Sequence, residues 1–174
     1  MKNIGTKEIT TERLILRKIK LEDAEPLLAS GSLSGTLEEA KKNIEARIKD
    51  YESPYTYHWV IEYNNMPIGR VLAWEVSTRD KYCQLGYDIS PEYRNRGFMT
   101  EAIKAIIVYL VDAADFNRVY CNVRTNNIGS NKVCQKAGMT LDGVLRKHFK
   151  SDIGFDDVNV YSFIKDDWKR DCFM

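Results

Sequence analysis

The sequence lacks several features that would assign a chain of 174 residues to a particular class. It has no apolar run near the ~20 residues that cross a bilayer, which argues against a membrane partner. Its four cysteines and two histidines do not have the close spacing of metal ligands, so no metal site is expected. The net charge of +1 is too small for a protein whose main partner is a nucleic acid.

The residues that are present describe an ordinary globular protein. Hydrophobic residues make up 44% and charged residues 29% of the chain, and no linker or repeat divides it. Residues 1–174 are therefore predicted to form a single domain with its own core. Reduced thiols and a cytoplasmic location are expected from the unpaired cysteines, which are Cys83, Cys121, Cys134 and Cys172.

Hydrophobic patterning predicts strands and helices in an irregular order around one sheet. The fold class is therefore α/β of the mixed, α+β kind. A capping box, Thr36 to Glu39, predicts the start of one helix, and Asn64-Asn65-Met66-Pro67 is predicted to turn a hairpin. The predicted strands are residues 14–19, 58–63, 68–76, 83–89, 119–123, 141–149 and 158–164.

The segment that follows Ile89 carries the strongest functional signal. An apolar strand ends there and runs into a short basic loop with one glycine, Gly97, which opens directly into a helix. The start of a helix leaves about four N–H groups without partners and carries partial positive charge. Together with Arg94 and Arg96, these groups predict a site for the diphosphate of a nucleotide-like cofactor.

The spacing Arg94-x-x-Gly97-x-Met99 is not that of a P-loop or of a dinucleotide-binding fold. It resembles the R/Q-x-x-G-x-G/A signature of the GNAT superfamily of acetyl-CoA-dependent N-acetyltransferases. Asn127-x-x-Ser130, followed by Lys-x-Gly-Met at residues 136–139, is similar to a second element of that superfamily.

Further matches lie at residues 11–17 and at Asp157-Val158, and residues 85–102 resemble the ribosomal-protein N-terminal (Rim-type) branch. The resemblance covers about residues 11–168. It implies a single, mostly antiparallel central sheet of six to seven strands, splayed between strands four and five, with about four helices.

The resemblance also implies the cofactor, acetyl-CoA, and its binding residues. Pantetheine would lie in the splay, with backbone N–H groups near Ile89 meeting the thioester carbonyl. Asn127 would cap its helix and also contact pantetheine. Met99 replaces the usual small residue, which predicts altered packing against the cofactor. The diphosphate would be held by Arg94, Asn95, Arg96, Gly97, Phe98, Met99 and Thr100.

Ser130 is the predicted catalytic residue. In the Rim-type branch a serine at this place lies near the cofactor sulfur and can protonate or hydrogen-bond the thiolate. Many other members use a tyrosine four residues further on, where this chain has Cys134, and a thiol is a weak donor. The alternative role for Ser130 is to satisfy a free N–H in the first turn of its helix.

No residue stands out as a general base. Rim-type relatives often carry glutamate where this chain has Gln84, and a neutral amide cannot accept a proton. Asp88, Glu75 and His148 remain as candidates from their strand positions, whereas His58 is interpreted as structural. An α-amine has a pKa of only about 8, so an acceptor of this kind does not require a dedicated base.

The leading hypothesis is acetyl transfer from acetyl-CoA to a primary amine, most favourably a protein or peptide N-terminus, by direct attack in a ternary complex. Two alternatives stay open: acetylation of a polyamine, amino acid or antibiotic, and a non-catalytic acyl-CoA-binding module. The protein is expected to be a monomer or homodimer. Structural or solvated roles are predicted for Asp152, Asp156 and Asp157, and core or rim positions for Trp59, Trp74 and Trp168.

Overall fold

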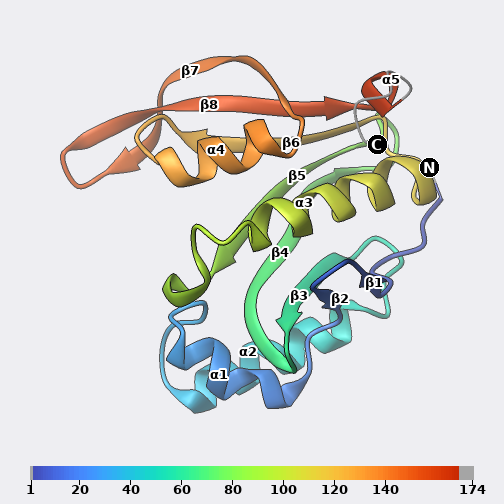
Figure 1. Ribbon diagram of the computed structural model, residues 1–174, viewed down its shortest axis with the longest axis vertical. Coiled ribbons are helices and arrows are strands. Elements are labelled where there is room, and N and C mark those ends of the chain that lie inside the picture. Colours follow the sequence, from blue (N-terminus) through green and yellow to red (C-terminus); the bar gives the residue numbers. More distant parts are fainter. Residues whose placement is uncertain (1, 169–174) are drawn as a thin grey trace.

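The computed structural model describes residues 2–168, with Trp168 described by its backbone alone (Figure 1). Cys172 lies outside the described residues. The strands are β1 (Ile9–Thr10), β2 (Ile15–Arg17), β3 (Tyr57–Tyr63), β4 (Met66–Ser77), β5 (Tyr82–Ile89), β6 (Arg118–Arg124), β7 (Thr140–Ser151) and β8 (Gly154–Ile164). The helices are α1 (Ala24–Ala29), α2 (Leu37–Asp50), α3 (Phe98–Val108), α4 (Ile128–Lys136) and α5 (Lys165–Trp168).

All eight strands form one sheet in the order β1-β2-β3-β4-β5-β6-β8-β7. Every neighbouring pair is antiparallel except β5 and β6, so the predicted mixed fold around a mostly antiparallel sheet is confirmed. The count exceeds the predicted six to seven strands because the two-residue β1 adds to the edge beside β2. A strand this short carries no periodic sequence signal.

The first hairpin is tighter than predicted. Met66 and Pro67 belong to β4, and only Asn64 and Asn65 form the turn between β3 and β4. Both asparagines have left-handed backbones, with φ of 50° and 61°. Asparagine tolerates this conformation, and two such residues make the turn whose twist matches that of the flanking strands.

The expected splay lies between the parallel strands β5 and β6, which are the fourth and fifth of the predicted strands. Their pairing joins Tyr82–Gln84 to Arg118–Tyr120 and then ends. Figure 1 shows the two strands meeting near α5 and separating towards the loop before α3. Since β5 remains paired with β4 as far as Ile89, residues 85–89 keep one edge without a strand partner among the described residues.

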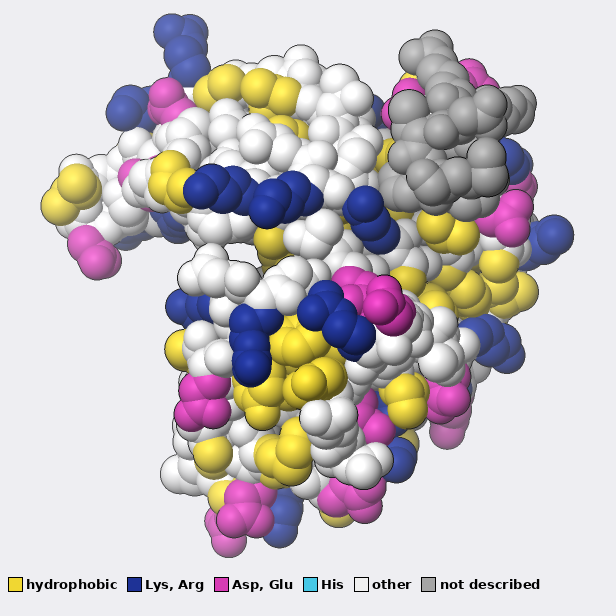
Figure 2. Space-filling model, in the orientation of Figure 1, with side chains coloured by type: hydrophobic (Ala, Val, Ile, Leu, Met, Phe, Trp, Pro, Cys, Tyr) yellow, Lys and Arg dark blue, Asp and Glu magenta, His cyan; other side chains and the backbone are white. Residues whose placement is uncertain are grey.

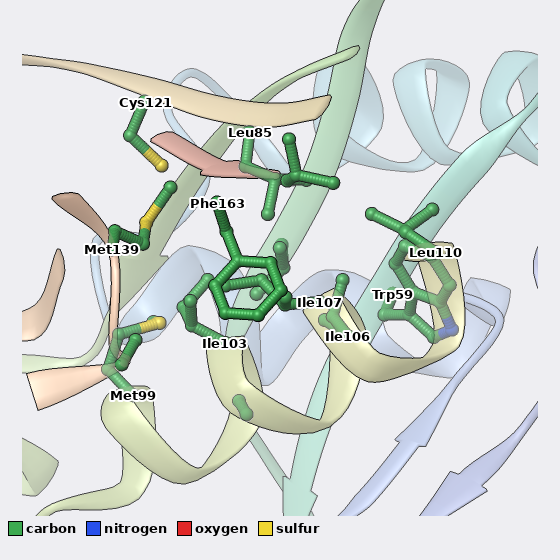
Figure 3. Close-up of a cluster of buried hydrophobic side chains, with 14 of the residues drawn as sticks. Trp59, Leu85, Met99, Ile103, Ile106, Ile107, Leu110, Cys121, Met139 and Phe163 are labelled. Carbon is green, nitrogen blue, oxygen red and sulfur yellow. The ribbon is translucent and has the colours of Figure 1, made fainter. Parts of the chain in front are cut away.

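Two apolar clusters hold the helices onto opposite faces of the sheet. Alternate side chains of β3 divide between them: Trp59 and Ile61 join the larger cluster with α3, and Val60 joins the smaller cluster with α1 and α2. Full burial of each aliphatic side chain contributes about 1.5–3 kcal/mol. The predicted core stripe of α3 and of the π-helical turn after it (Tyr109–Ala113) is confirmed as fully buried. It comprises Ile103, Ile106, Ile107 and Leu110, which Figure 3 shows, and Ala114.

Candidate active site

The loop between β5 and α3 has the geometry of an anion cradle. After a short 3-10 turn (Pro91–Tyr93), Asn95 and Gly97 adopt left-handed backbones, with φ of 59° and 83°. Gly97 is the N-cap of α3, so the N–H groups of the first helical turn point out of the helix end. The side chains of Arg94 and Arg96 are exposed beside them. Backbone donors, the helix dipole and two basic residues thus occur together in one short loop, in which Arg94 Nε donates to the carbonyl of Ile89 at 3.3 Å.

Two of the residues predicted to bind the cofactor can contact a ligand at this loop only through their backbone. Phe98 and Met99 are 3% and 6% exposed, and both belong to the larger core cluster. Figure 3 shows Met99 among the buried side chains, on the same side of the cluster as Met139. The bulk of Met99 is therefore accommodated by the core, and its N–H group remains available to a ligand. Thr100, one residue further on, is half-buried.

An ion pair from the start of the chain braces the loop. Both oxygens of Glu101 are engaged: Oε1 accepts from Thr11 Oγ1 at 2.6 Å and from Arg13 N at 3.0 Å, and Oε2 accepts from Arg13 Nε at 2.7 Å. Arg13 also donates to the carbonyl of Arg96 at 3.1 Å and lies 4.5 Å from the ring centre of Phe98. Two segments about ninety residues apart in the sequence therefore hold the loop in place.

A cavity of about 260 Å³ lies where β5 and β6 separate. Trp74 forms one side of it, with its ring so close to Gly86 that a Cβ there would lie 2.2 Å from a ring carbon. Only glycine fits beneath this tryptophan. The other residues that line the cavity are Leu85, Tyr87, Cys121, Asn122, Val123, Arg124, Asn127, Ser130 and Phe149.

Ser130 projects its hydroxyl towards β5. Its Oγ donates to the hydroxyl of Tyr87 at 2.7 Å, whereas its backbone N–H donates to Asn127 Oδ1 at 3.1 Å. The helix cap is therefore Asn127, as the sequence predicts, and the alternative capping role of Ser130 is not observed. The hydroxyl of Ser130 is left to face the cavity.

The ionisable groups beside Ser130 are a phenol and two thiols, of which Cys134 has a lowered pKa because Cys121 and Tyr87 hydrogen-bond to it. Burial, together with the thiols of Cys134 and Cys121, holds the pKa of Tyr87 above its usual range. A hydrogen bond to Cys134 and complete burial likewise raise the pKa of Cys121. Cys83, Cys121 and Cys134 are all free and buried, in agreement with the predicted reduced thiols.

None of the candidate bases lines the cavity. The carboxylate of Asp88 accepts from Arg70 Nη2 at 2.9 Å, and that of Glu75 accepts from the hydroxyl of Tyr120. His148 is exposed on β7, and burial lowers the pKa of His58 to about 4, which makes it a neutral structural residue.

Gln84, which stands where Rim-type relatives often carry glutamate, is buried on the face of β5 opposite to Tyr87. Its Oε1 accepts from Asn122 Nδ2 at 3.4 Å. The acidic residues after β7 have structural or solvated surroundings, as predicted. Asp156 pairs with Arg124, Asp157 Oδ1 accepts from Lys147 N at 2.9 Å, and Asp152 is exposed.

Basic side chains flank the entrance to the splay. Figure 2 shows a hollow between the part of the molecule that carries α4 and the part that carries the start of α3, with Lys and Arg side chains on both sides. Lys132 and Lys136 of α4 are exposed, as are Arg94 and Arg96 of the loop. A positive rim of this kind attracts a phosphorylated ligand.

The sequence did not identify Tyr87, Trp74 and Phe149 as cavity residues. Tyr87 had the clearest available signal, because it stands two residues before the strand end at which the cofactor is expected. Trp74 and Phe149 come from β4 and β7, which are distant in the sequence, and only the assembled sheet brings them together.

No helix among residues 2–168 is long and apolar enough to span a membrane, and no group of three or more metal-ligating side chains occurs within the same range.

The splayed sheet, the backbone-built anion cradle and the cavity between them define an acyl-CoA-dependent transferase fold. Residues 13–140 match the family model described as acetyltransferase (GNAT) domain. The chain belongs to this family, and it is an acetyltransferase that uses acetyl-CoA.

Relatives support this assignment over most of the chain. The uncharacterized N-acetyltransferase YoaA of Bacillus subtilis is 29% identical over 90% of this chain and 96% of its own length. The ribosomal-protein-serine acetyltransferase of Escherichia coli is 23% identical over 74% of this chain and 72% of its own. The fold is shared with RimL, a ribosomal L7/L12 alpha-N-protein acetyltransferase solved with coenzyme A. Its TM-score is 0.79 at 20% identity, over 91% of this chain and 98% of RimL.

Proposed function

We propose that this acetyltransferase modifies the N-terminal α-amine of a protein or peptide, by direct attack of the amine on acetyl-CoA in a ternary complex. The observation that carries the proposal is the chemistry of the cavity. Its lining residues include no carboxylate and no imidazole, and they bring amide, hydroxyl, thiol, guanidinium and aromatic groups to the cavity.

An α-amine suits such a site better than a lysine side chain does. Its pKa of about 8 leaves part of it neutral near pH 7, whereas the lysine amine, with a pKa of about 10.4, needs a base to become a nucleophile. The similarity to the ribosomal-protein-serine acetyltransferase of Escherichia coli and to the alpha-N-protein acetyltransferase RimL agrees with a protein N-terminus as the acceptor.

The cofactor fits the two parts of the site in different ways. The diphosphate would lie on the N–H groups of the first turn of α3, between the guanidinium groups of Arg94 and Arg96. Pantetheine would lie along residues 85–89 of β5, where the unpaired strand edge offers N–H and C=O groups. Asn127, whose side chain also caps α4, borders the same cavity.

Ser130 is proposed to act on the departing thiolate. The amine nitrogen forms a bond to the acetyl carbon, the carbon–sulfur bond breaks, and its electron pair goes to sulfur. The proton that the nitrogen loses ends on that sulfur as the free thiol. The hydroxyl of Ser130, which faces the cavity, would donate a hydrogen bond to the sulfur as its negative charge develops.

A thiol-release assay with acetyl-CoA tests the acceptor. The matched acceptors are a peptide with a free N-terminus and no lysine, the same peptide with a blocked N-terminus and one internal lysine, a polyamine, and free amino acids. We expect turnover with the first peptide and at most about a tenth of it with the second, because the lysine amine remains protonated. Faster turnover with the polyamine or with an amino acid would replace the peptide N-terminus by a small-molecule acceptor.

A further inference from the structure

Tyr87 connects the two sides of the splay at the proposed catalytic serine. It belongs to β5, and it reaches across to α4. Its hydroxyl accepts from Ser130 Oγ at 2.7 Å, and the same oxygen lies 3.2 Å from the backbone oxygen of Ser130 and 3.4 Å from Cys134 Sγ. A phenol has one proton to donate and can accept bonds as well, so one hydroxyl serves all these partners.

We propose that Tyr87 is a positioning residue for Ser130. Its hydroxyl holds the hydroxyl of Ser130 at the wall of the cavity, and it donates a hydrogen bond to Ser130 Oγ once that group turns its own proton to the leaving thiolate. This inference rests on the proposed role of Ser130. It assigns no proton transfer to the tyrosine itself, which remains a phenol throughout.

The surroundings of Tyr87 favour this role over a mainly structural one. The ionisable groups that face its hydroxyl are the thiols of Cys134 on α4 and Cys121 on β6, and burial keeps the phenol protonated beside them. A serine hydroxyl that accepts a hydrogen bond is a better donor, because bonded hydroxyls polarise one another. Tyr87 of β5 thus supplies a second hydroxyl beside that of Ser130, which the thiol of Cys134 on α4 cannot do.

Replacing Tyr87 by phenylalanine tests the idea with little change in packing. We expect Tyr87→Phe to lower kcat about 10-fold, the effect of one lost hydrogen bond in the transition state, while KM for acetyl-CoA changes less than about 2-fold. Tyr161→Phe is the matched control: the hydroxyl of Tyr161 also bonds α4, accepting from Gln135 Nε2 at 3.2 Å, but Tyr161 does not line the cavity. The melting temperature of Tyr161→Phe should be close to that of Tyr87→Phe, and its kcat should equal that of the unmodified protein.

The double variant separates this inference from the proposed function. If Tyr87 acts through Ser130, adding Tyr87→Phe to Ser130→Ala lowers kcat by less than about 2-fold. A full 10-fold loss on that background would overturn the positioning role, as would a normal kcat in the single Tyr87→Phe variant while Ser130→Ala is slow. Normal turnover of Ser130→Ala would remove the proposed catalytic serine and the role of Tyr87 with it.

A second variant keeps the inference testable should Tyr87→Phe fail to fold. Incorporating 3,5-difluorotyrosine at position 87 preserves the ring and the hydroxyl but makes the phenol more acidic. Because burial keeps the phenol protonated, the modified residue retains a donor to Ser130 Oγ, and kcat should stay within about 2-fold of the unmodified protein or rise. A kcat about 10-fold lower in this folded variant, which keeps the hydroxyl, would contradict the role of the Tyr87 hydroxyl as a donor to Ser130.

Discussion

The cofactor loop and the splay cavity bind through opposite means. In the loop, residues 94–100, the ligand is offered backbone N–H groups and exposed guanidinium groups, while the side chains of Phe98 and Met99 are turned into the core. In the cavity, the groups that face the ligand are side chains from four strands and the start of a helix, with Ser130 and Tyr87 bonded to each other.

This difference decides how each region responds to mutation. A site built from backbone fails only when the backbone changes shape or when a side chain fills the space, so glycine positions and the brace by Glu101 matter most there. A site built from side chains fails when a single functional group is removed. Four experiments use this contrast, and they are ordered from the largest expected effect to the smallest.

Removing the hydroxyl of Ser130 should have the largest effect. Ser130→Ala is expected to lower kcat by roughly 10- to 1000-fold, the range of a proton-transfer role, with acetyl-CoA affinity nearly unchanged. Because Asn127 provides the cap of α4, the variant should melt close to the original protein. Thr36→Ala, which removes the cap of α2, is the control for a purely structural loss. Normal turnover with a lowered melting temperature would end the catalytic assignment.

Gly97→Val should disable the loop without touching the cavity. The added side chain requires a valine at φ 83° and places its Cβ 3.3 Å from Arg13 Nη2, which braces the loop, so acetyl-CoA affinity should fall more than about 10-fold in calorimetry. Gly31→Val carries the same backbone strain at φ 74°, with no atom within 4 Å of the new Cβ. It should lose stability and keep its affinity. Equal affinity in both variants would mean that the diphosphate binds elsewhere.

Glu101→Gln should weaken the loop only modestly. Burial opposes the ionisation of Glu101, but the hydrogen bonds from Thr11 and Arg13 outweigh it and hold the pKa of Glu101 below its usual range. Because Arg13 is partly exposed, the loss should be about 1 kcal/mol of stability and a few-fold in affinity.

The pH dependence of that loss follows from the sign of the shift. A lowered pKa in the folded state gives stability that is present above the unfolded pKa of about 4.3 and disappears as the pH falls through the folded value. The difference in melting temperature between Glu101→Gln and the original protein should therefore shrink below pH 4. A constant difference from pH 7 to pH 3 would contradict the brace.

Oxidation of the buried thiols should have the smallest effect. All four cysteines of the chain should titrate as free thiols in denaturant, and Cys83, Cys121 and Cys134 should react slowly before unfolding because they are buried. Omitting reductant should leave kcat unchanged within about 2-fold, since Cys83, Cys121 and Cys134 are buried and structural thiols of this kind are unreactive. Recovery of two thiols in place of four would reveal a disulfide.

The loop was predictable from the sequence because its parts are contiguous. A strand end, two arginines, a glycine with a left-handed backbone and the start of a helix lie within about ten residues, so spacing alone indicates the anion cradle. The brace was only partly predictable. Residues 11–17 and Glu101 both belong to segments that match the family, but the sequence does not indicate that they bond to each other.

The cavity was not predictable to the same degree. The position of Ser130 and the splay followed from the resemblance, whereas the partner of the Ser130 hydroxyl did not. Alternation along β5 places Tyr87 and Gln84 on opposite faces, but which helix receives Tyr87 depends on where α4 packs. The absence of a carboxylate from the cavity lining likewise depends on which residues the tertiary structure brings to the cavity.

The sequence by itself determined the elements with local causes: the apolar stripe of α3, the capping box of α2, the turn at two asparagines and the loop that opens α3. Each depends on residues within one or two helical turns of one another. Only the tertiary structure decided that Trp74 covers Gly86, that Arg13 braces Glu101 and that Tyr87 holds Ser130. Those contacts join strands and helices far apart in the chain, and they form only because burial of the common core fixes where each element ends.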